Sequence, residues 1–282
     1  MNGVPRSDFL AAMSESSRQR VAQARARAPE RELQARALAL PRPPRLKWSA
    51  GGFDLIAEVK LRSPAAGKLK DGAEDIAARV TAYADAGAAA ISVLTEPSRF
   101  DGSLSHLSAA AGALGSRTPV MRKDFLVDPY QVFEARVAGA GGILLILRML
   151  TSAEVQALLD AAAALGLFVL LEAFDAADLA RSATLVESHR SRMQLLVGVN
   201  CRDLVTLEVV PGRLEQLAAL LPPTVARVAE SGVSTGADAA RVAAAGYSVA
   251  LVGSALMQAD DPRALADALL CAGRAAASAR CG

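Results

Sequence analysis

The sequence predicts an α/β protein built as a (β/α)8 TIM barrel with an N-terminal helical extension. Short aliphatic runs alternate with Ala- and Leu-rich segments of helical periodicity, which is typical of parallel βαβ units. The runs are almost continuously apolar, as expected of strands that are covered on both faces. No linker or change of composition divides residues 50–282. We therefore expect a helical extension over residues 1–48 and a single catalytic barrel over residues 49–282.

The expected strands follow one another from residue 53 to residue 252. An open, doubly wound sheet is the structural alternative. It is disfavoured because no GxGxxG motif follows the first strand, and Gly51-Gly52 precede that strand instead. Helical periodicity is clear over 74–86, 128–139, 151–165 and 235–245. The expected strands are 53–60, 89–94, 119–125, 143–147, 167–172, 195–200, 225–230 and 248–252.

The segment before the barrel, residues 7–40, has the pattern of a helix that ends at the prolines beginning with Pro41. Residues 1–50 hold ten Lys or Arg against four Asp or Glu, although the whole chain has a net charge of only +2. Such an arm could bind nucleic acid, target an organelle or form a solvated helix face. Interleaved glutamates argue against a transit peptide, and we favour the solvated helix.

Composition narrows the classes of function. Aromatic residues make up only 4% of the chain, which favours aliphatic packing over stacking on nucleic acid bases. No run of about 18 apolar residues predicts a membrane span, and the opening MNGVPRSDFL lacks the apolar core of a secretion signal. The three cysteines form no CxxC pair, so we expect a reduced, cytoplasmic protein. Two histidines are too few for a multi-histidine metal centre, so we expect no metal and assign acid–base chemistry to carboxylates and lysines.

Polar residues stand at the carboxyl ends of five expected strands, which is where parallel barrels place their active sites. A single charged strand end is commonly just solvated, but five together favour one shared site. Alternation along the first strand puts Glu58 and Lys60 on the same inward face. Carboxylates and ammonium groups that converge on one cavity can tune one another's proton affinity. The candidate catalytic residues are Glu58, Lys60, Lys123, Glu172, Asn200 and Glu230.

Glycine and serine follow the last two expected strands. Ser231 and Gly232 follow the seventh, while Gly253 and Ser254 follow the eighth and open a short helix-like segment. Glycines let backbone amides approach an anion, and the loops after these strands commonly bind phosphate in such barrels. The pattern predicts a phosphorylated small-molecule ligand.

Several motifs, in order along the chain, resemble the indole-3-glycerol-phosphate synthase family. The block RKDFLVDPYQVFEAR is highly specific, whereas LLE and ESGV mean little individually. The similarity covers about residues 53–262, and the helical extension is similar too. The motifs are IAEVKLRSP (56–64), SVLTE (92–96), FDGS (100–103), RKDFLVDPYQVFEAR (122–136), LLE (170–172), VGVNCRDL (197–204), ESGV (230–233) and LVGSALM (251–257).

The resemblance implies ring closure of 1-(2-carboxyphenylamino)-1-deoxyribulose 5-phosphate to indole-3-glycerol phosphate, with loss of carbon dioxide and water, in tryptophan biosynthesis. Decarboxylation would restore aromaticity after cyclisation, so we expect no cofactor. By motif, Lys123 resembles the general acid, Glu172 the carboxylate of the later dehydration, and Lys60 a substrate-contacting lysine that could share acid duty. A lysine donates protons readily near neutral pH if its pKa is lowered, so we expect burial, Lys60 or both to lower the pKa of Lys123.

The remaining assignments also follow from the resemblance. Glu58 and Glu230 resemble supporting carboxylates. Asn200 and Arg202 are similar to residues beside the anthranilate portion of the substrate. Phe125 and Phe100, which stand close to strand ends in the matched motifs, are candidates for enclosing the aromatic ring. The residues expected to bind substrate are Ser63, Phe125, Arg202, Ser231, Gly232, Gly253 and Ser254.

Three positions depart from the family pattern: Leu61, Ala65 and Cys201. They could weaken binding or shift specificity, although none removes a proposed proton donor or acceptor. Alternation directs Cys201 away from the cavity, which favours a buried structural thiol over a nucleophile.

Three alternative functions stay open at this point. One is a Schiff-base sugar-phosphate aldolase that uses Lys123 or Lys60 as nucleophile. Another is a non-catalytic barrel that binds a phosphate ligand, against which the four intact acid–base residues argue. The third is nucleic-acid binding by the basic arm; we expect neither nucleic-acid nor membrane binding.

For the oligomeric state, which the sequence does not determine, a monomer is our working hypothesis. The printed chain stops at residue 282 without a second barrel, so we expect no fused enzyme of the pathway.

Overall fold

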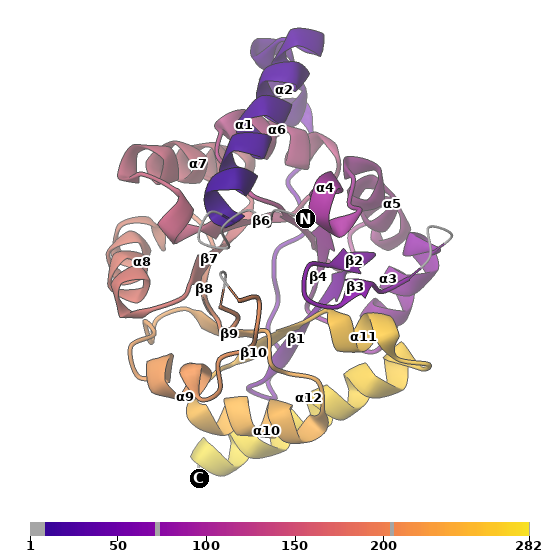
Figure 1. Cartoon of the computed structure of the whole chain (residues 1–282), viewed down its shortest axis with the longest axis vertical. Helices are drawn as coiled ribbons and strands as arrows, with labels where there is room; N and C mark the ends of the chain where they lie inside the picture. The colour runs from indigo at the N-terminus through magenta and orange to yellow at the C-terminus, as the bar shows by residue number, and fades with distance from the viewer. Residues whose placement is uncertain (1–8, 71–73, 204–205, 282) are drawn as a thin grey trace, which may run out of the picture.

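The computed structural model describes residues 9–70, 74–203 and 206–281 and shows a closed, parallel barrel surrounded by helices (Figure 1). Around the barrel the strands follow the order β1-β10-β9-β8-β7-β6-β5-β4. The predicted fold class is confirmed, since every expected aliphatic run overlaps one barrel strand. These strands are β1 (Asp54–Val59), β4 (Ala90–Leu94), β5 (Val120–Lys123), β6 (Gly142–Ile146), β7 (Phe168–Ala173), β8 (Leu195–Asn200), β9 (Ala226–Glu230) and β10 (Val249–Val252).

Helices cover the outside of the barrel, and within the described part of the chain none is long and apolar enough to cross a membrane. The loop after β1 forms a small antiparallel ribbon of β2 (Arg62–Ser63) and β3 (Gly67–Lys68), which lacks an aliphatic run and was not predicted. The helices after β1 are α3 (Ile76–Asp85), α4 (Pro97–Phe100), α5 (Leu104–Leu114), α6 (Pro129–Val137), the 3-10 turn η2 (Leu147–Met149), α7 (Ser152–Leu165), α8 (Ala176–His189), α9 (Arg213–Ala218), α10 (Gly236–Ala245), α11 (Ser254–Gln258) and α12 (Pro262–Cys281).

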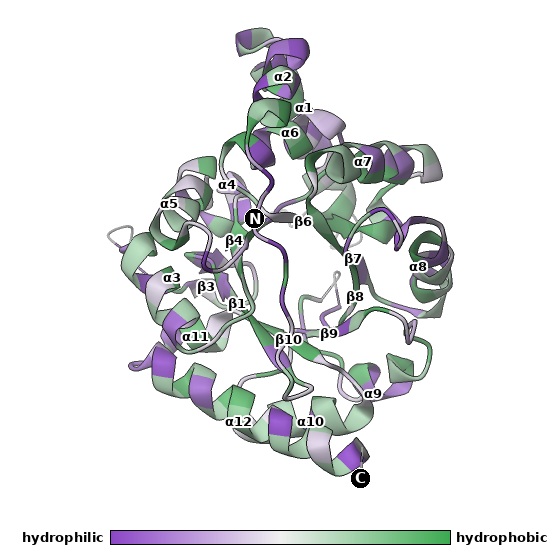
Figure 2. Ribbon diagram, turned by 180° about the vertical axis from the view of Figure 1, so that it is seen from behind, coloured by the Kyte–Doolittle hydropathy of each residue, from purple (hydrophilic) through white to green (hydrophobic). Residues whose placement is uncertain are grey.

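Strand alternation divides the apolar residues into two layers. Along β7, Phe168 and Leu170 belong to the cluster inside the barrel, while Val169 and Leu171 belong to the cluster between strands and helices. Both layers are aliphatic for the most part, as the composition predicts. Figure 2 shows hydrophilic stretches on outer helices such as α7 and α12. The inward-facing residues at the carboxyl ends of the strands line the functional site.

The N-terminal extension consists of two helices, α1 (Phe9–Arg27) and α2 (Glu30–Ala39), where a single helix over 7–40 was expected. The break falls at Pro29, which has an extended ψ of 135° and lacks an amide hydrogen. Positions 7 and 8 of the expected helix lie outside the described residues. The expectation of a solvated helix holds only in part, because α1 buries Met13 and Val21.

Two arginines of α1 make ion pairs with the barrel. Arg25 donates to both carboxylate oxygens of Asp128, at 2.8 and 3.0 Å. Arg20 donates to both oxygens of Asp124, also at 2.8 and 3.0 Å, and the Asp124 side chain is completely buried. Part of the arginine excess therefore attaches the extension to the barrel.

Asp124 is the centre of a buried charge cluster. Arg122 donates to it at 3.0 Å and Thr95 at 2.7 Å, in addition to Arg20. Burial alone would raise the pKa of Asp124, but the charges of Arg122 and Arg20 outweigh it and hold the pKa well below its usual range. The cluster thus fixes α1 against the end of β5.

Between α2 and β1 the chain crosses the N-terminal end of the barrel, as Figure 2 shows from behind. Leu46 in this segment is buried in the inner apolar cluster. The Gln194 side chain donates to the Leu46 carbonyl at 3.1 Å. Trp48, by contrast, is 41% exposed, so it lies at the rim of this end and far from the carboxyl ends of the strands. The extension therefore closes the base of the barrel.

We predict that Asp124→Ala lowers the free energy of unfolding by about 3–5 kcal/mol, because the buried Arg122 and the partly buried Arg20 lose the carboxylate that both contact. Urea denaturation of the variant and the unsubstituted protein measures the difference. The matched control is Asp160→Ala, which removes a carboxylate paired with Arg192 where both side chains are about half exposed; its loss is expected to stay below about 1 kcal/mol.

Equal losses for the two variants would contradict the central role of Asp124. Acid pH gives a second check. Since the folded pKa is depressed, the stabilisation is present above the unfolded value of about 3.9 and is lost as the pH falls toward the folded value. The difference between Asp124→Ala and the unsubstituted protein should narrow below about pH 4.

Candidate active site

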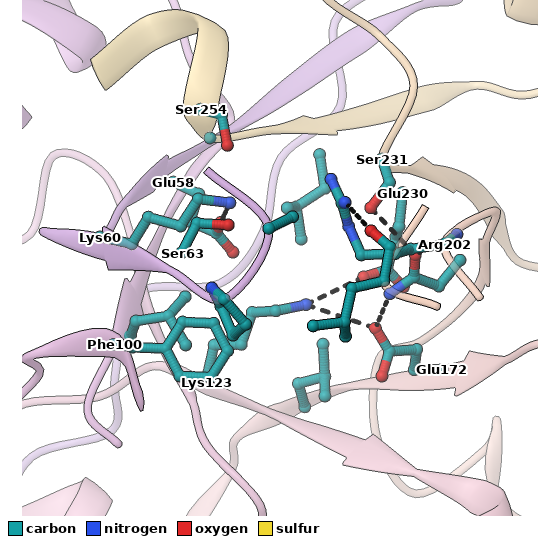
Figure 3. A pocket seen from close by; sticks show the side chains of 18 of the residues that line it. Glu58, Lys60, Ser63, Phe100, Lys123, Glu172, Arg202, Glu230, Ser231 and Ser254 are labelled. Carbon is teal, nitrogen blue, oxygen red and sulfur yellow. Dashed lines mark hydrogen bonds and ion pairs between the residues drawn. The ribbon is translucent and has the colours of Figure 1, made fainter. Parts of the chain in front are cut away.

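One cavity of about 340 Å³ lies at the carboxyl ends of the barrel strands (Figure 3). The structure brings every residue that the sequence analysis singled out for the site into the lining of this cavity. They come from the ends of β1, β5, β7, β8, β9 and β10 and from the loops that follow. They are Glu58, Lys60, Ser63, Lys123, Phe125, Glu172, Asn200, Arg202, Glu230, Ser231, Gly232, Gly253 and Ser254.

Lys123 is the cation at the centre of the cavity. Its Nζ lies 3.1 Å from Oε2 of Glu230 and 3.4 Å from Oε1 of Glu172 (Figure 3). The Lys123 side chain is 18% exposed, while the two glutamates are 1% and 3% exposed. The ammonium group can therefore reach a ligand in the cavity, and the two carboxylates, which also line it, are less exposed to solvent.

The expected lowering of the Lys123 pKa is wrong. Burial does lower it, but the negative charges of Glu172, Glu230 and Glu58 outweigh burial and raise the pKa of Lys123 above its ordinary value. Sequence alone could not predict this, because it does not give the distances to carboxylates on other strands. For Glu230, burial is the main cause of a pKa well above the usual range of a carboxyl group, and the charge of Lys123 opposes it.

Asn200 connects three elements of the site. Its amide nitrogen donates to Oε1 of Glu172 at 2.9 Å. Its oxygen accepts from the Ser231 hydroxyl at 2.9 Å and from the backbone amide of Arg202 at 3.0 Å. Since each side of the amide has a defined partner, Asn200 fixes the Glu172 carboxylate relative to the loop after β9. The Arg202 guanidinium donates to the Leu207 carbonyl at the edge of the cavity.

The opposite side of the cavity carries a second ion pair, with Lys60 Nζ 2.9 Å from Oε1 of Glu58. A Cβ atom at Gly253 would lie 2.4 Å from the same carboxylate oxygen and 3.0 Å from Lys60 Nζ. Glycine is therefore the residue that fits beside this pair. The loop after β9 turns through positive φ at Ser231 (66°) and Gly232 (70°), and both residues line the cavity together with the loop after β10.

An apolar wall completes the cavity. The Phe9 and Phe125 rings meet edge to face with centroids 5.9 Å apart, and Phe100 lies 6.2 Å from Phe125. Phe174 also lines the cavity, and Arg148 stacks on its ring at 4.5 Å. Phe9 and Phe174 were not predicted as site residues. Phe9, Leu10 and Met13 are large apolar residues at the start of an otherwise polar helix, and this pattern was the signal that could have identified Phe9.

The three departures from the family pattern occupy different positions. Leu61 is buried in the outer apolar cluster, and Ala65 lines the cavity. Cys201 is 2% exposed, as expected of a structural thiol, and burial raises the pKa of its thiol. A Cβ atom at Gly232 would lie 2.9 Å from the Cys201 sulfur, so the thiol packs directly behind the loop after β9.

The profile of the family described as "Indole-3-glycerol phosphate synthase" matches residues 10–269. The chain belongs to this family. An indole-3-glycerol phosphate synthase of Opitutus terrae is 43% identical over 232 residues, covering 80% of this chain and 84% of that protein. The enzyme of the same name from a Nocardioides species is 44% identical over 222 residues, covering 79% and 82%.

Solved structures support the fold alone. A 3-hexulose-6-phosphate synthase from Salmonella typhimurium aligns with a TM-score of 0.61 at 16% identity, over 78% of this chain and 98% of that one. A tryptophan synthase from M. tuberculosis aligns with a TM-score of 0.54 at 20% identity, over 80% and 94%. These identities are too low to transfer a function.

As an indole-3-glycerol phosphate synthase, the protein is a carboxy-lyase of tryptophan biosynthesis that acts on a phosphorylated small molecule. It converts 1-(2-carboxyphenylamino)-1-deoxyribulose 5-phosphate to indole-3-glycerol phosphate, releasing carbon dioxide and water. The substrate has an aromatic ring at one end and a phosphate at the other. The cavity correspondingly has an aromatic wall and two glycine-containing loops.

We predict that Phe9→Ala raises the KM for this substrate about tenfold with a smaller effect on kcat, because it removes an apolar surface and an aromatic contact from the wall. Steady-state kinetics measures both constants. Trp48→Ala is the control, since it truncates an aromatic residue at the opposite end of the barrel. An unchanged KM for Phe9→Ala would show that the first helix does not contribute to substrate binding.

Proposed function

We propose that Lys123 is the general acid of the ring-closing step of the indole-3-glycerol phosphate synthase reaction, held protonated and in position by Glu172 and Glu230. The observation that supports this proposal is the contact of one partly exposed ammonium group with two buried carboxylates in the cavity. A proton donor must carry its proton before the reaction. Lys123 meets this condition, since a lysine of ordinary pKa is protonated at neutral pH and the carboxylates raise the pKa of Lys123 further.

The two ends of the substrate would be bound on separate parts of the lining. Backbone amides and hydroxyls at Ser231-Gly232 and Gly253-Ser254 would bind the phosphate, together with Ser63. The aromatic ring would lie against Phe125 and its neighbours, with Arg202 near the carboxylate. Fixing both ends aligns the ring carbon with the carbonyl group, and well-oriented reactions of this kind gain as much as about 7–11 kcal/mol from proximity.

Ring closure forms the bond between the aromatic carbon that carries the carboxylate and the ketone carbon of the deoxyribulose chain. Lys123 gives a proton to the ketone oxygen, which becomes a hydroxyl group. The bond to the carboxylate then breaks, carbon dioxide leaves, and its electron pair restores the aromatic ring. The electrons remain within the substrate, so the step requires no cofactor.

Dehydration follows. Lys123 has already given its proton in ring closure, so Lys60 protonates the hydroxyl group, which leaves as water. Glu172 takes the proton that the new ring must lose. Asn200 holds Glu172 at 2.9 Å for this transfer. Glu58 holds the Lys60 ammonium group in the cavity through an ion pair of 2.9 Å.

We further propose that residues 1–48 form the extension and residues 49–282 the catalytic barrel of a cytoplasmic monomer that binds neither nucleic acid nor membranes. The ion pairs of Arg20 and Arg25 with the barrel support this proposal for nucleic acid, because they occupy cations that such binding would need. Sedimentation of the purified protein tests the monomer. Titration with labelled DNA and RNA at low salt tests the other part.

The main prediction is that Lys123→Ala lowers kcat by about 10²–10⁴-fold, the usual effect of a positioned general acid, while inorganic phosphate or a product analogue still binds. Supplying the carboxyphenylamino-deoxyribulose phosphate and following indole fluorescence measures turnover. Lys47→Ala, at an exposed position in the segment under the barrel, is the control. Undiminished turnover in Lys123→Ala would refute the assignment.

A Schiff-base aldolase would use the same lysine differently. Borohydride reduction in the presence of substrate should leave no covalent adduct on Lys123 or Lys60 if the proposal is correct, because no carbon–nitrogen bond forms to the enzyme. An adduct detected by mass spectrometry would favour the aldolase.

We also predict that chelators leave turnover unchanged. Among the described residues no group of three or more His, Cys, Asp or Glu side chains is arranged to hold a metal ion. Assays with and without EDTA, on protein analysed for bound metal, check this. A loss that Mg²⁺ or Zn²⁺ restores would require a different proton donor from the one proposed.

A further inference from the structure

Gly198 lies on β8 beneath the polar layer of the site and faces the barrel interior. Its register partners are Glu172 on β7 and Val228 on β9. Two residues further along β8, Asn200 is the register partner of Glu230. Gly198 is therefore one layer below Glu230, on the neighbouring strand.

The Glu230 carboxylate occupies the space that a side chain at position 198 would need. A Cβ atom built on Gly198 would lie 2.1 Å from Oε1 of Glu230 and 3.1 Å from its Cδ. Real Cβ atoms essentially never approach another heavy atom within 3.0 Å. On the other side, Leu170 Cδ1 would be 3.2 Å away. Gly198 is not among the residues with positive φ, so the backbone conformation does not require glycine here.

The two oxygens of Glu230 have different surroundings. Oε2 contacts Lys123 at 3.1 Å. Oε1 is buried and has no hydrogen-bond partner among the residues that the structure describes. No hydrogen bond therefore fixes Oε1, and the shape of the space above Gly198 determines where this oxygen lies.

We propose that Gly198 is a positioning residue: the missing side chain creates the slot that seats the Glu230 carboxylate against Lys123. This inference rests on the proposed role of Lys123 as the proton donor. A side chain at position 198 would act on the reaction only through Glu230. The slot thus determines how much negative charge faces the ammonium group.

The charge around Lys123 has several sources, and Glu230 is one of them. Glu172 and Glu58 also raise the pKa of Lys123. Displacing Glu230 would lower that pKa toward its ordinary value, so the protonated form would be lost at a lower pH. The titratable or charged groups that face Lys123 or line the same cavity are Glu58 and Lys60 from β1 and its end, Asp124 after β5, Glu172 from β7, Arg202 after β8 and Glu230 from β9.

We expect Gly198→Ala to lower kcat about 10–100-fold, the effect of a displacement on the order of 1 Å in a catalytic group, with KM changed less than about threefold. The alkaline limb of the kcat/KM profile should shift to lower pH, because Lys123 loses part of the charge that keeps it protonated. Stopped assays over a pH series measure both effects. A lost packing contact alone would not move this limb.

Gly142→Ala is the matched control. Gly142 also lies on a barrel strand, and a Cβ atom there would lie 2.3 Å from the Phe168 ring, which belongs to the inner apolar cluster. The clash is as severe but involves no charged group. This variant should lose stability and keep the alkaline limb of the unsubstituted protein. An equal shift of the limb in both variants would overturn the inference.

A double-mutant cycle with Glu230→Ala tests whether Gly198 acts through Glu230. Truncating Glu230 removes the atoms that an alanine at 198 would meet. The double variant should therefore fold and have the kcat of Glu230→Ala alone, even if Gly198→Ala by itself fails to fold. A double variant that is unfolded, or more than about threefold slower than Glu230→Ala, would overturn the proposal.

The Lys123→Ala variant distinguishes a failure of the proposed function from a failure of the inference about Gly198. If Lys123→Ala keeps its turnover, the proposed function fails whatever Gly198 does. If Lys123→Ala is inactive but Gly198→Ala keeps the kcat and the alkaline limb of the unsubstituted protein, only the inference about Gly198 is overturned.

Discussion

Two glutamates lie almost completely buried at the top of the barrel, and Lys123 is the cation that both contact. Buried carboxylates without a partner cost several kcal/mol, and like charges close together raise that cost further. Asn200 holds one of them by its amide, and Gly198 leaves room for the other. The position of one ammonium group thus depends on several strands, which is an arrangement that a closed barrel can supply and an isolated helix cannot.

The chain places a second charge cluster directly beside the first. Lys123 lines the cavity among glutamates, while the next residue, Asp124, is held by Arg122 and Arg20. The ion pairs of Asp124 with Arg122 and Arg20 hold the end of β5, and the Lys123 side chain extends from this part of the backbone. The two clusters have opposite central charges, a cation among carboxylates in one and a carboxylate between guanidinium groups in the other.

The fold could be predicted well because strand alternation and helical periodicity are local properties of the sequence. The carboxyl ends of the strands also marked out residues that meet in one cavity, since barrel topology brings those ends together. What could not be predicted depends on distances between strands and segments. The direction of the Lys123 pKa shift follows from carboxylates on β1, β7 and β9. The contribution of Phe9 to the cavity depends on how the extension packs against the barrel. The break at Pro29, by contrast, follows from a local property, the missing amide hydrogen of proline.

The extension touches both ends of the barrel. Phe9 and Leu10 line the mouth, and Leu46 is buried at the base. One segment of fewer than fifty residues therefore contributes to both the mouth of the cavity and the base of the barrel. Removing the extension would expose the mouth of the cavity and the base of the barrel at the same time. Such a truncation cannot separate an effect on ligand binding from an effect on stability. For the same reason, insertions or deletions between α2 and β1 should be tolerated poorly, because they would displace Leu46 from the inner apolar cluster.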